Sequence, residues 1–135
     1  MYDIRFDHEH RTLHLSAHGI WTLGVHAKFT AEVLAKGIPA RIRYGSIAIL
    51  ADLREHPIQP AELNQHSEVL IARAVALNKG PIALVVGSVL GKLQAEQFLS
   101  VPTSRIFLDM NEARRWLQEC WIDEGYVPTD RILQR

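Results

Sequence analysis

The sequence predicts an α/β protein with a mixed sheet of about five strands and four helices. Two short, almost unbroken apolar runs, residues 46–53 and 82–86, are closed by polar, Gly or Pro residues, as strands buried on both faces are. Segments of helical periodicity separate these runs, and buried strands joined by helices pair in parallel through right-handed crossovers. Alternation of apolar and polar residues over 2–7 and 13–18 predicts an antiparallel hairpin at the start of the sheet.

Each further element has its own start and stop signals. The first helix covers residues 23–36, where apolar residues recur at helical spacing, and Gly37 and Pro39 end it. Residues 40–45 then form a basic connector to the central strand. The remaining predicted elements are a helix over 60–78, a strand over 82–86, a helix over 89–99, a strand over 105–108 and a helix over 112–122.

Composition limits the class of protein. The 135 residues suit one domain, which we place at residues 1–122, followed by a surface tail over 123–135. Fifteen basic and fifteen acidic residues balance, so no net field attracts nucleic acid or an anionic membrane. A lone Cys120 makes no internal disulfide, and no signal-peptide core or run of about 20 apolar residues is present. We expect a soluble cytoplasmic domain.

The element order and several motifs resemble the small STAS-type domains called SpoIIAA-like. The resemblance covers residues 2–120 and rests on a buried strand ending Ala51-Asp52-Leu53, the strand over 81–86, the helix around 95–98 and the ending over 105–117. It implies a β/α superhelical fold shared with anti-sigma-factor antagonists and CRAL-TRIO lipid-binding domains. Such domains are generally binding or regulatory modules rather than enzymes.

The regulatory branch of that family carries a phosphorylatable Ser or Thr directly after the central strand. Residues 54–60 of this chain contain no hydroxyl, and Ser67 lies inside the predicted helix. The resemblance therefore carries no phosphorylation switch over to this chain. Of the functions that the resemblance implies, binding of a ligand or of a protein partner remains.

Two turns form the candidate ligand site, because open α/β sheets bind ligands at the carboxyl ends of their strands. The first turn contains Asp52, Arg54 and His56, which form either an ion pair that fastens a loop or acid–base machinery. The second contains Gly87, Ser88 and Lys92. The spacing and the Leu93 after the lysine depart from the Walker pattern, which argues against nucleotide hydrolysis.

Two interpretations of the second turn stay open. Ser88 either only caps its helix, or the free N–H groups at this helix start bind a small anion with help from Lys92.

We expect the remaining His, Cys and aromatic side chains to have mainly structural roles. The seven histidines show no metal-ligand spacing, and we expect most of them at the surface, with His26 as a boundary histidine near the apolar edge of the first helix. Cys120 lies at core spacing from Trp116. Four aromatic residues either pack in the core or wall an apolar pocket: Trp21, Phe29, Trp116 and Trp121. Trp121 lies off the apolar stripe of the last helix, which suits an interface such as that of a homodimer.

These observations predict a non-enzymatic binding module without cofactor or metal. Its ligand is a small apolar (lipid-like) or anionic molecule, or its partner is a protein. One alternative is a small enzyme that uses Asp52 and His56 at the end of the central strand. The other is a purely structural dimerisation domain that makes contact through its last helix and tail.

Overall fold

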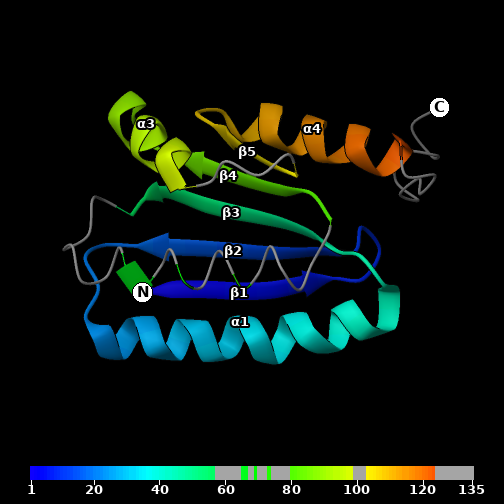
Figure 1. The fold of residues 1–135 in the computed structure, drawn as a ribbon, viewed down its shortest axis with the longest axis horizontal. Coiled ribbons are helices and arrows are strands. Elements are labelled where there is room, and N and C mark those ends of the chain that lie inside the picture. The colour runs from blue at the N-terminus through cyan, green and yellow to red at the C-terminus, as the bar shows by residue number, and fades with distance from the viewer. Residues whose placement is uncertain (57–64, 67–68, 70–72, 74–79, 99–102, 124–135) are drawn as a thin grey trace.

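A computed structural model of the protein describes residues 1–56, 65–66, 69, 73, 80–98 and 103–123. The elements follow one another as β1 (Tyr2–Asp7), β2 (Thr12–His18), α1 (Leu23–Tyr44), β3 (Ala48–Glu55), β4 (Ile82–Val86), α3 (Val89–Phe98), β5 (Ser104–Phe107) and α4 (Met110–Asp123) (Figure 1). None of the helices in these described ranges is long and apolar enough to cross a membrane.

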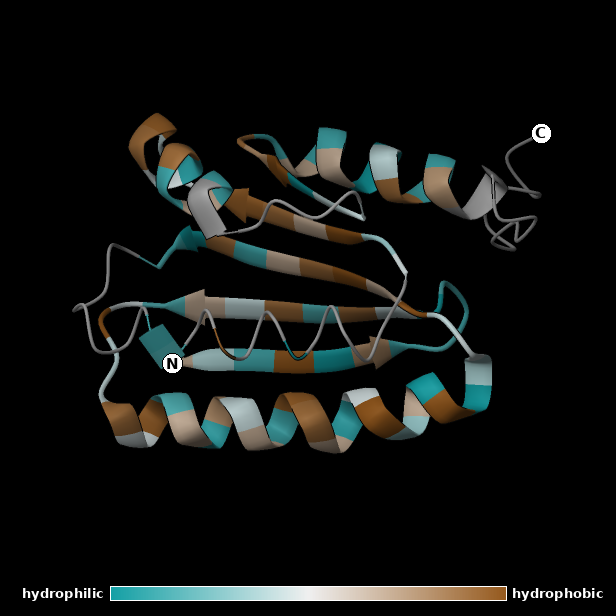
Figure 2. Cartoon of the chain, viewed as in Figure 1, coloured by the Kyte–Doolittle hydropathy of each residue, from teal (hydrophilic) through white to brown (hydrophobic). Residues whose placement is uncertain are grey.

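The five strands form one sheet whose spatial order equals their order in the chain. β1 and β2 are antiparallel, and β2, β3, β4 and β5 pair in parallel. This confirms the mixed sheet with an N-terminal hairpin. β3 and β4 occupy the middle, and four consecutive residues of β3 and all of β4 are buried. Figure 2 shows how strongly apolar these two strands are.

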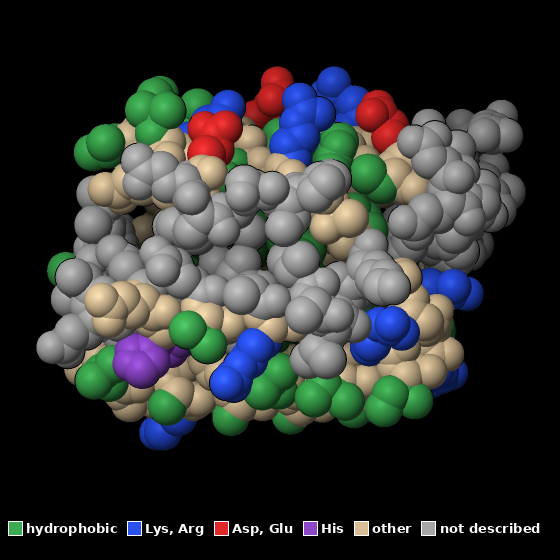
Figure 3. Space-filling model, in the orientation of Figure 1, with side chains coloured by type: hydrophobic (Ala, Val, Ile, Leu, Met, Phe, Trp, Pro, Cys, Tyr) green, Lys and Arg blue, Asp and Glu red, His purple; other side chains and the backbone are tan. Residues whose placement is uncertain are grey.

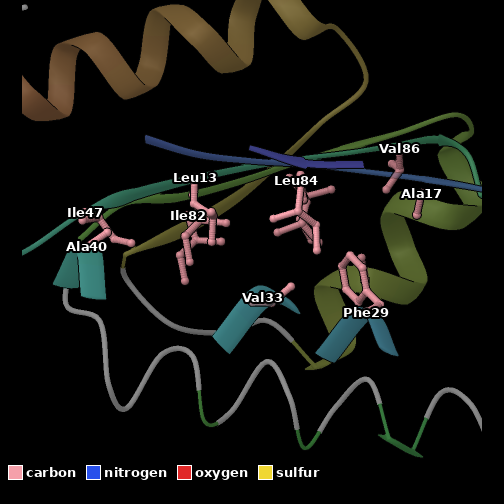
Figure 4. Packing of buried hydrophobic residues seen from close by; sticks show 14 of the residues in the cluster. Leu13, Ala17, Phe29, Val33, Ala40, Ile47, Ile82, Leu84 and Val86 are labelled. Atoms are coloured by element: carbon pink, nitrogen blue, oxygen red, sulfur yellow. The ribbon is translucent and has the colours of Figure 1, made fainter. Parts of the chain in front are cut away.

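The two faces of the sheet have separate cores, because side chains alternate along each strand. The larger core lies between the sheet and the helices α1 and α3 (Figure 4) and includes Leu13, Phe29, Val33, Leu84 and Ala95. The smaller core lies under α4, where Leu50, Ala83, Val85, Phe107 and Leu117 pack together. α4 therefore covers one face of β3, β4 and β5, and α1 and α3 cover the other face of the sheet.

The end of α1 differs from the prediction. The helix does not end at residue 36 but continues through Gly37 and Pro39 to Tyr44, so residues 40–45 are not a connector. Tertiary packing overrides the local stop signals. Ala40 is buried in the larger core, and the Tyr44 ring stacks on Phe6 with 5.8 Å between ring centroids.

Gly45, rather than Gly37, ends α1. Its φ of 84° lies in the left-handed region that favours glycine, and its N–H donates to the carbonyl of Arg41 at 2.9 Å. Gly37 lies inside the helix beside Leu13, and a Cβ at this position would make an ordinary contact of 3.6 Å with Leu13 Cδ2. Pro39 is exposed on the outer side of the helix.

The predicted helix over 60–78 lies for the most part outside the described residues, although Gln65, His66, Val69 and Arg73 are helical. The prediction of four helices is therefore not confirmed, and three are described in full. The last helix begins at Met110, two residues earlier than predicted, because Asp109 caps it by accepting the Asn111 N–H at 2.9 Å. Most of the tail over 123–135 is outside the described residues.

The free edge of β1 is protected by side chains of α1. Lys36 Nζ donates to the Ile4 carbonyl at 2.5 Å, and the Tyr2 hydroxyl donates to Glu32 Oε1 at 2.8 Å. Charged residues on an edge strand oppose pairing with a strand of another chain. β1 carries Asp3, Arg5 and Asp7 on the face opposite to α1, which adds to this protection.

Candidate functional site

The two predicted segments lie side by side at one edge of the sheet, which we call the carboxyl edge. Asp52 and Arg54 belong to β3 itself, which runs to Glu55, and not to a turn that follows the strand. β3 and β4 are in register through Leu53 and Val86, so the chain leaves both strands at the same level. A Cβ on Gly87 would lie 2.5 Å from the carbonyl oxygen of Arg54. The structure therefore brings together the two turns that the sequence predicted to form a site. That they bind a ligand stays a prediction.

Asp52 and Arg54 form a two-pronged ion pair. Arg54 Nε donates to Asp52 Oδ1 at 2.9 Å, Nη2 donates to Oδ2 at 2.8 Å, and the Arg54 backbone N–H reaches Oδ1 at 3.2 Å. The hydrogen bonds from Arg54 lower the pKa of the Asp52 carboxyl, and Asp52 raises the pKa of the guanidinium. Asp52 is therefore ionised and both of its carboxylate oxygens accept hydrogen bonds from Arg54, as expected for an ion pair that fastens a loop.

His56 does not join Asp52. Asp52 follows Leu50 on the face of β3 that α4 covers. The His56 ring contacts Trp21 with 4.7 Å between centroids, and Trp21 belongs to the core on the opposite face. Each of the two side chains has its own partner, so the geometry does not support an Asp52–His56 acid–base pair.

His56 and Trp21 hold the connection between β2 and α1. The His56 ring makes a hydrogen bond to the backbone of Gly19, and Trp21 Nε1 donates to the His18 carbonyl at 3.0 Å. His56 Nδ1 is buried without a hydrogen-bond partner among the described residues, so Nε2 makes the bond to Gly19. Burial of the ring lowers the pKa of His56 and so favours the neutral imidazole.

A second imidazole lies close to Trp21, and a third lies close to the second. The His26 ring is 6.3 Å from the Trp21 ring, and the His66 ring is 6.0 Å from that of His26. Burial lowers the pKa of His26, with a smaller effect from His66, and burial also lowers the pKa of His56. His26, expected as a boundary histidine near the apolar edge of the first helix, is buried on the inner side of α1. No pattern in the sequence pairs these residues, because they come from three separate segments.

The lowered pKa values of His26 and His56 predict that acid destabilises the fold. His26 and His56 have lowered pKa values in the folded state, so the unfolded chain binds more protons as the pH falls below the ordinary histidine pKa of about 6.5. We expect the free energy of unfolding to be constant above that pH and to fall below it. Urea denaturation between pH 5 and pH 8 measures this dependence, and His56→Phe should make it shallower. A free energy of unfolding that rises as the pH falls toward 5 would contradict the lowered pKa values of His26 and His56.

Ser88 caps α3. Its Oγ accepts the Gly91 N–H at 3.0 Å, and its carbonyl accepts the Lys92 N–H at 3.0 Å. This confirms the interpretation of Ser88 as a helix cap. One of the N–H groups at this helix start is therefore already satisfied, and a role for Lys92 in anion binding stays a prediction.

The carboxyl edge also carries exposed apolar side chains that the sequence analysis did not single out. Val89, Leu90 and Leu93 are 63%, 57% and 56% exposed in the first turns of α3, and we call these three residues the α3 patch. Ile20 is 71% exposed at the same edge, after β2. Figure 3 shows hydrophobic side chains gathered at the upper left, over α3. The signal in the sequence was the adjacent pair Val89-Leu90 at a helix start, where polar residues are usual.

Comparison with solved structures supports the fold directly. The structure matches that of an uncharacterised DUF3478-family protein with a SpoIIAA-like fold from Shewanella loihica PV-4, with a TM-score of 0.64 and 21% sequence identity. The match covers 87% of this chain and 92% of that protein. The fold is SpoIIAA-like. No family model matches the sequence, and no curated protein matches it.

The SpoIIAA-like fold confirms the resemblance that the motifs indicated. In this fold β3 ends with Arg54 and Glu55 and is followed by His56, and none of these residues carries a hydroxyl at the place where the regulatory branch resembled by the sequence has one. Residues 57–60 of that turn lie outside the described residues. The side chain of Trp121, the predicted interface residue, is also outside them, although its backbone belongs to α4.

The described part of the SpoIIAA-like domain holds no group of three His, Cys, Asp or Glu side chains that could bind a metal ion. Cys120 is half-buried on α4. Trp116 packs against Phe107 with 5.7 Å between ring centroids, so it belongs to the core under α4. Trp21 and Phe29 likewise pack together in the larger core, at 4.9 Å.

Proposed function

We propose that this SpoIIAA-like domain is a non-enzymatic module that binds a partner protein at its carboxyl edge. The observation that carries the proposal is the α3 patch. Three large apolar side chains, each more than half exposed, stand together at the edge where open α/β sheets bind their ligands. Exposed apolar groups that are concentrated in one place indicate an interaction site, whereas single ones do not.

The charges at this edge favour a protein over a small anion. Arg54 is neutralised by Asp52, and His18 Nε2 lies 3.2 Å from Glu55 Oε2. An anion that used Arg54 or His18 would have to displace one of these carboxylates. Paired charges beside apolar side chains instead resemble a protein interface, in which an apolar centre is surrounded by a polar rim.

The exposure of the α3 patch also favours a protein over a lipid-like molecule. Side chains that bind such a molecule line an enclosed pocket that buries most of the ligand. Leu90 and Leu93 instead project from the outside of a helix, with more than half of each side chain exposed. The contacts of Asp52 and His56 with different partners favour a binding module over an enzyme.

The proposal is tested by cross-linking and then by affinity. A photoreactive residue at Leu90 should capture a protein from cells of the source organism, and the same residue at exposed Glu119 on α4 should not. With the captured partner purified, Leu90→Ser combined with Leu93→Ser should weaken its binding about 100-fold, the loss typical of removing central interface residues. Isothermal titration calorimetry measures the two affinities.

Two results would contradict the proposal. One is equal cross-linking from positions 90 and 119. The other is native mass spectrometry of the gently purified protein that shows a bound small molecule, released on denaturation and lost in the Leu90→Ser variant. Substitution by serine of Ile42 on α1, which is more exposed than Leu90 at 78%, is the control and should leave partner binding unchanged.

A further inference from the structure

The β1–β2 hairpin is polar on the face of the sheet where α4 lies. Among the described residues, the core under α4 takes its sheet side chains from β3, β4 and β5 and none from the hairpin, so α4 does not extend over β1 and β2. Alternation along the two strands sends their apolar side chains into the core on the opposite face. It leaves on this face a row of polar side chains, which we call the hairpin ledge: Asp3, Arg5, His14 and Ser16.

The register of the hairpin makes Arg5 and His14 neighbours. Arg5 lies directly opposite His14, and Asp3 lies directly opposite Ser16. The Cβ atoms of such cross-strand pairs are about 5 Å apart, so their side chains lie next to each other. His14 is half-buried and Arg5 is exposed. A guanidinium group that solvent can reach therefore stands beside an imidazole that solvent reaches only in part.

α4 contributes a second arginine beside the hairpin ledge. Arg114 follows the buried Ala113 and lies three positions before the buried Leu117, so it borders the stripe through which α4 packs on the sheet. Arg115 is one position further along, about 100° further round the helix, and lies on its outer side. Of these two neighbouring arginines, Arg114 is the one that lies toward the sheet.

The two arginines act on the same imidazole. Burial is the largest cause of the lowered pKa of His14, and the charges of Arg5 and Arg114 lower this pKa further. Asp7 has the opposite effect, and His10 adds to the lowering. Because the ordinary pKa of histidine is about 6.5, His14 is neutral at pH 7, beside two positive charges that disfavour its protonated form.

Neither arginine is paired with an acid among the described residues. The Asp7 carboxylate is occupied by His10, with 2.6 Å between Oδ2 and Nδ1. No hydrogen bond or ion pair joins Asp3 to Arg5, and none joins Arg114 to a described carboxylate. Like charges gathered beside a half-buried imidazole oppose folding, and local conflicts of this kind are expected at functional sites.

We propose that Arg5, His14 and Arg114 bind the phosphate group of a small molecule on the hairpin ledge. Two guanidinium groups match the two negative charges of a phosphomonoester, whereas one guanidinium matches a carboxylate. The imidazole donates a further hydrogen bond, as does the hydroxyl of Ser16, two residues along the same row of β2. This site lies on the face of the sheet opposite to α3 and is therefore separate from the α3 patch.

The pKa of His14 in the presence of a divalent anion tests the site. NMR titration of the full chain measures this pKa in sodium chloride and in sodium sulfate of the same ionic strength. Sulfate is the probe because it keeps both charges throughout the titration of histidine, whereas phosphate does not. A bound dianion offsets the charges of Arg5 and Arg114, so the pKa of His14 should be higher in sulfate. The pKa of His56, which contacts the core on the other face, should be equal in the two salts.

Titration with glycerol phosphate, followed by the shift of the His14 resonance, tests the two arginines. Arg5→Gln and Arg114→Gln each remove charge-assisted hydrogen bonds to the phosphate and should raise the dissociation constant about tenfold. Arg115→Gln removes the same charge from the adjacent position on the outer side of α4 and should leave the dissociation constant unchanged. Circular dichroism shows whether the three variants are folded.

Three results would overturn the proposal. The first is an equal pKa of His14 in the two salts, and the second is equal weakening by Arg114→Gln and Arg115→Gln. The third is binding to vesicles that contain phosphatidic acid without binding of glycerol phosphate, which would assign the phosphate to a lipid headgroup. The Leu90→Ser and Leu93→Ser variants should bind glycerol phosphate normally, so this proposal and that of partner binding fail separately.

Discussion

Replacing Leu13 by alanine is expected to lower the free energy of unfolding by about 3 kcal/mol, the cost typical of emptying a tightly packed apolar site. Leu13 is 1% exposed and lies on β2 in the larger core. Leu13 Cδ2 packs against Gly37 of α1, so that a Cβ at position 37 would lie 3.6 Å from it. The lost side chain therefore opens a cavity between the sheet and the helix that covers it.

Urea denaturation followed by circular dichroism measures this loss. Leu90→Ala is the matched control, because it removes the same atoms from a side chain that is 57% exposed and should cost less than about 0.5 kcal/mol. Equal losses in the two variants would show that Leu13 does not occupy the core position described above.

Replacing Gly87 by alanine is expected to cost about 2 kcal/mol and to disturb the ion pair at the carboxyl edge. The new Cβ would lie 2.5 Å from the Arg54 carbonyl oxygen, a backbone atom that cannot rotate away. The ends of β3 and β4 must separate, at a cost typical of overpacking. Because Arg54 holds the pKa of Asp52 low, moving Arg54 should bring that pKa back toward its ordinary value.

Urea denaturation measures the stability of the Gly87→Ala variant, and NMR titration of Asp52 measures the pKa. Gly37→Ala is the control, since its Cβ meets only the Leu13 side chain at 3.6 Å and alanine favours a helix interior over glycine by about 0.5–1 kcal/mol. An unchanged stability and an unchanged Asp52 pKa in Gly87→Ala would refute the close approach of the two strand ends.

Much of the fold was predictable because local and tertiary signals agree. Residues 82–86 were predicted as a strand and form β4 with the same bounds. The first helix shows where agreement fails. Gly37 and Pro39 are stop signals in isolation, but burial of Ala40 and stacking of Tyr44 on Phe6 hold the chain helical beyond them. Those contacts join segments far apart in the chain, and no local pattern reports them.

The position of the candidate site could be predicted from the sequence, but the contacts between its side chains could not. Parallel order alone places the turns after β3 and β4 together, and the structure confirms it at Arg54 and Gly87. The contact between His56 and Trp21 depends on where the β2–α1 connection crosses the end of β3. Side-chain periodicity carries no information about that crossing. The spacing of apolar residues does not distinguish the α3 patch from a core stripe, and the adjacent pair Val89-Leu90 at the helix start was its one local signal.

The sheet order has a consequence for synthesis on the ribosome. Since every strand pairs with the strand that precedes it in the chain, the sheet can grow at one edge while translation proceeds, without a gap left for a later strand. The face under α4 is the exception. The helix that covers Leu50, Ala83 and Val85 is translated after all five strands. Nascent chains halted before Met110 therefore leave this apolar surface exposed to chaperones.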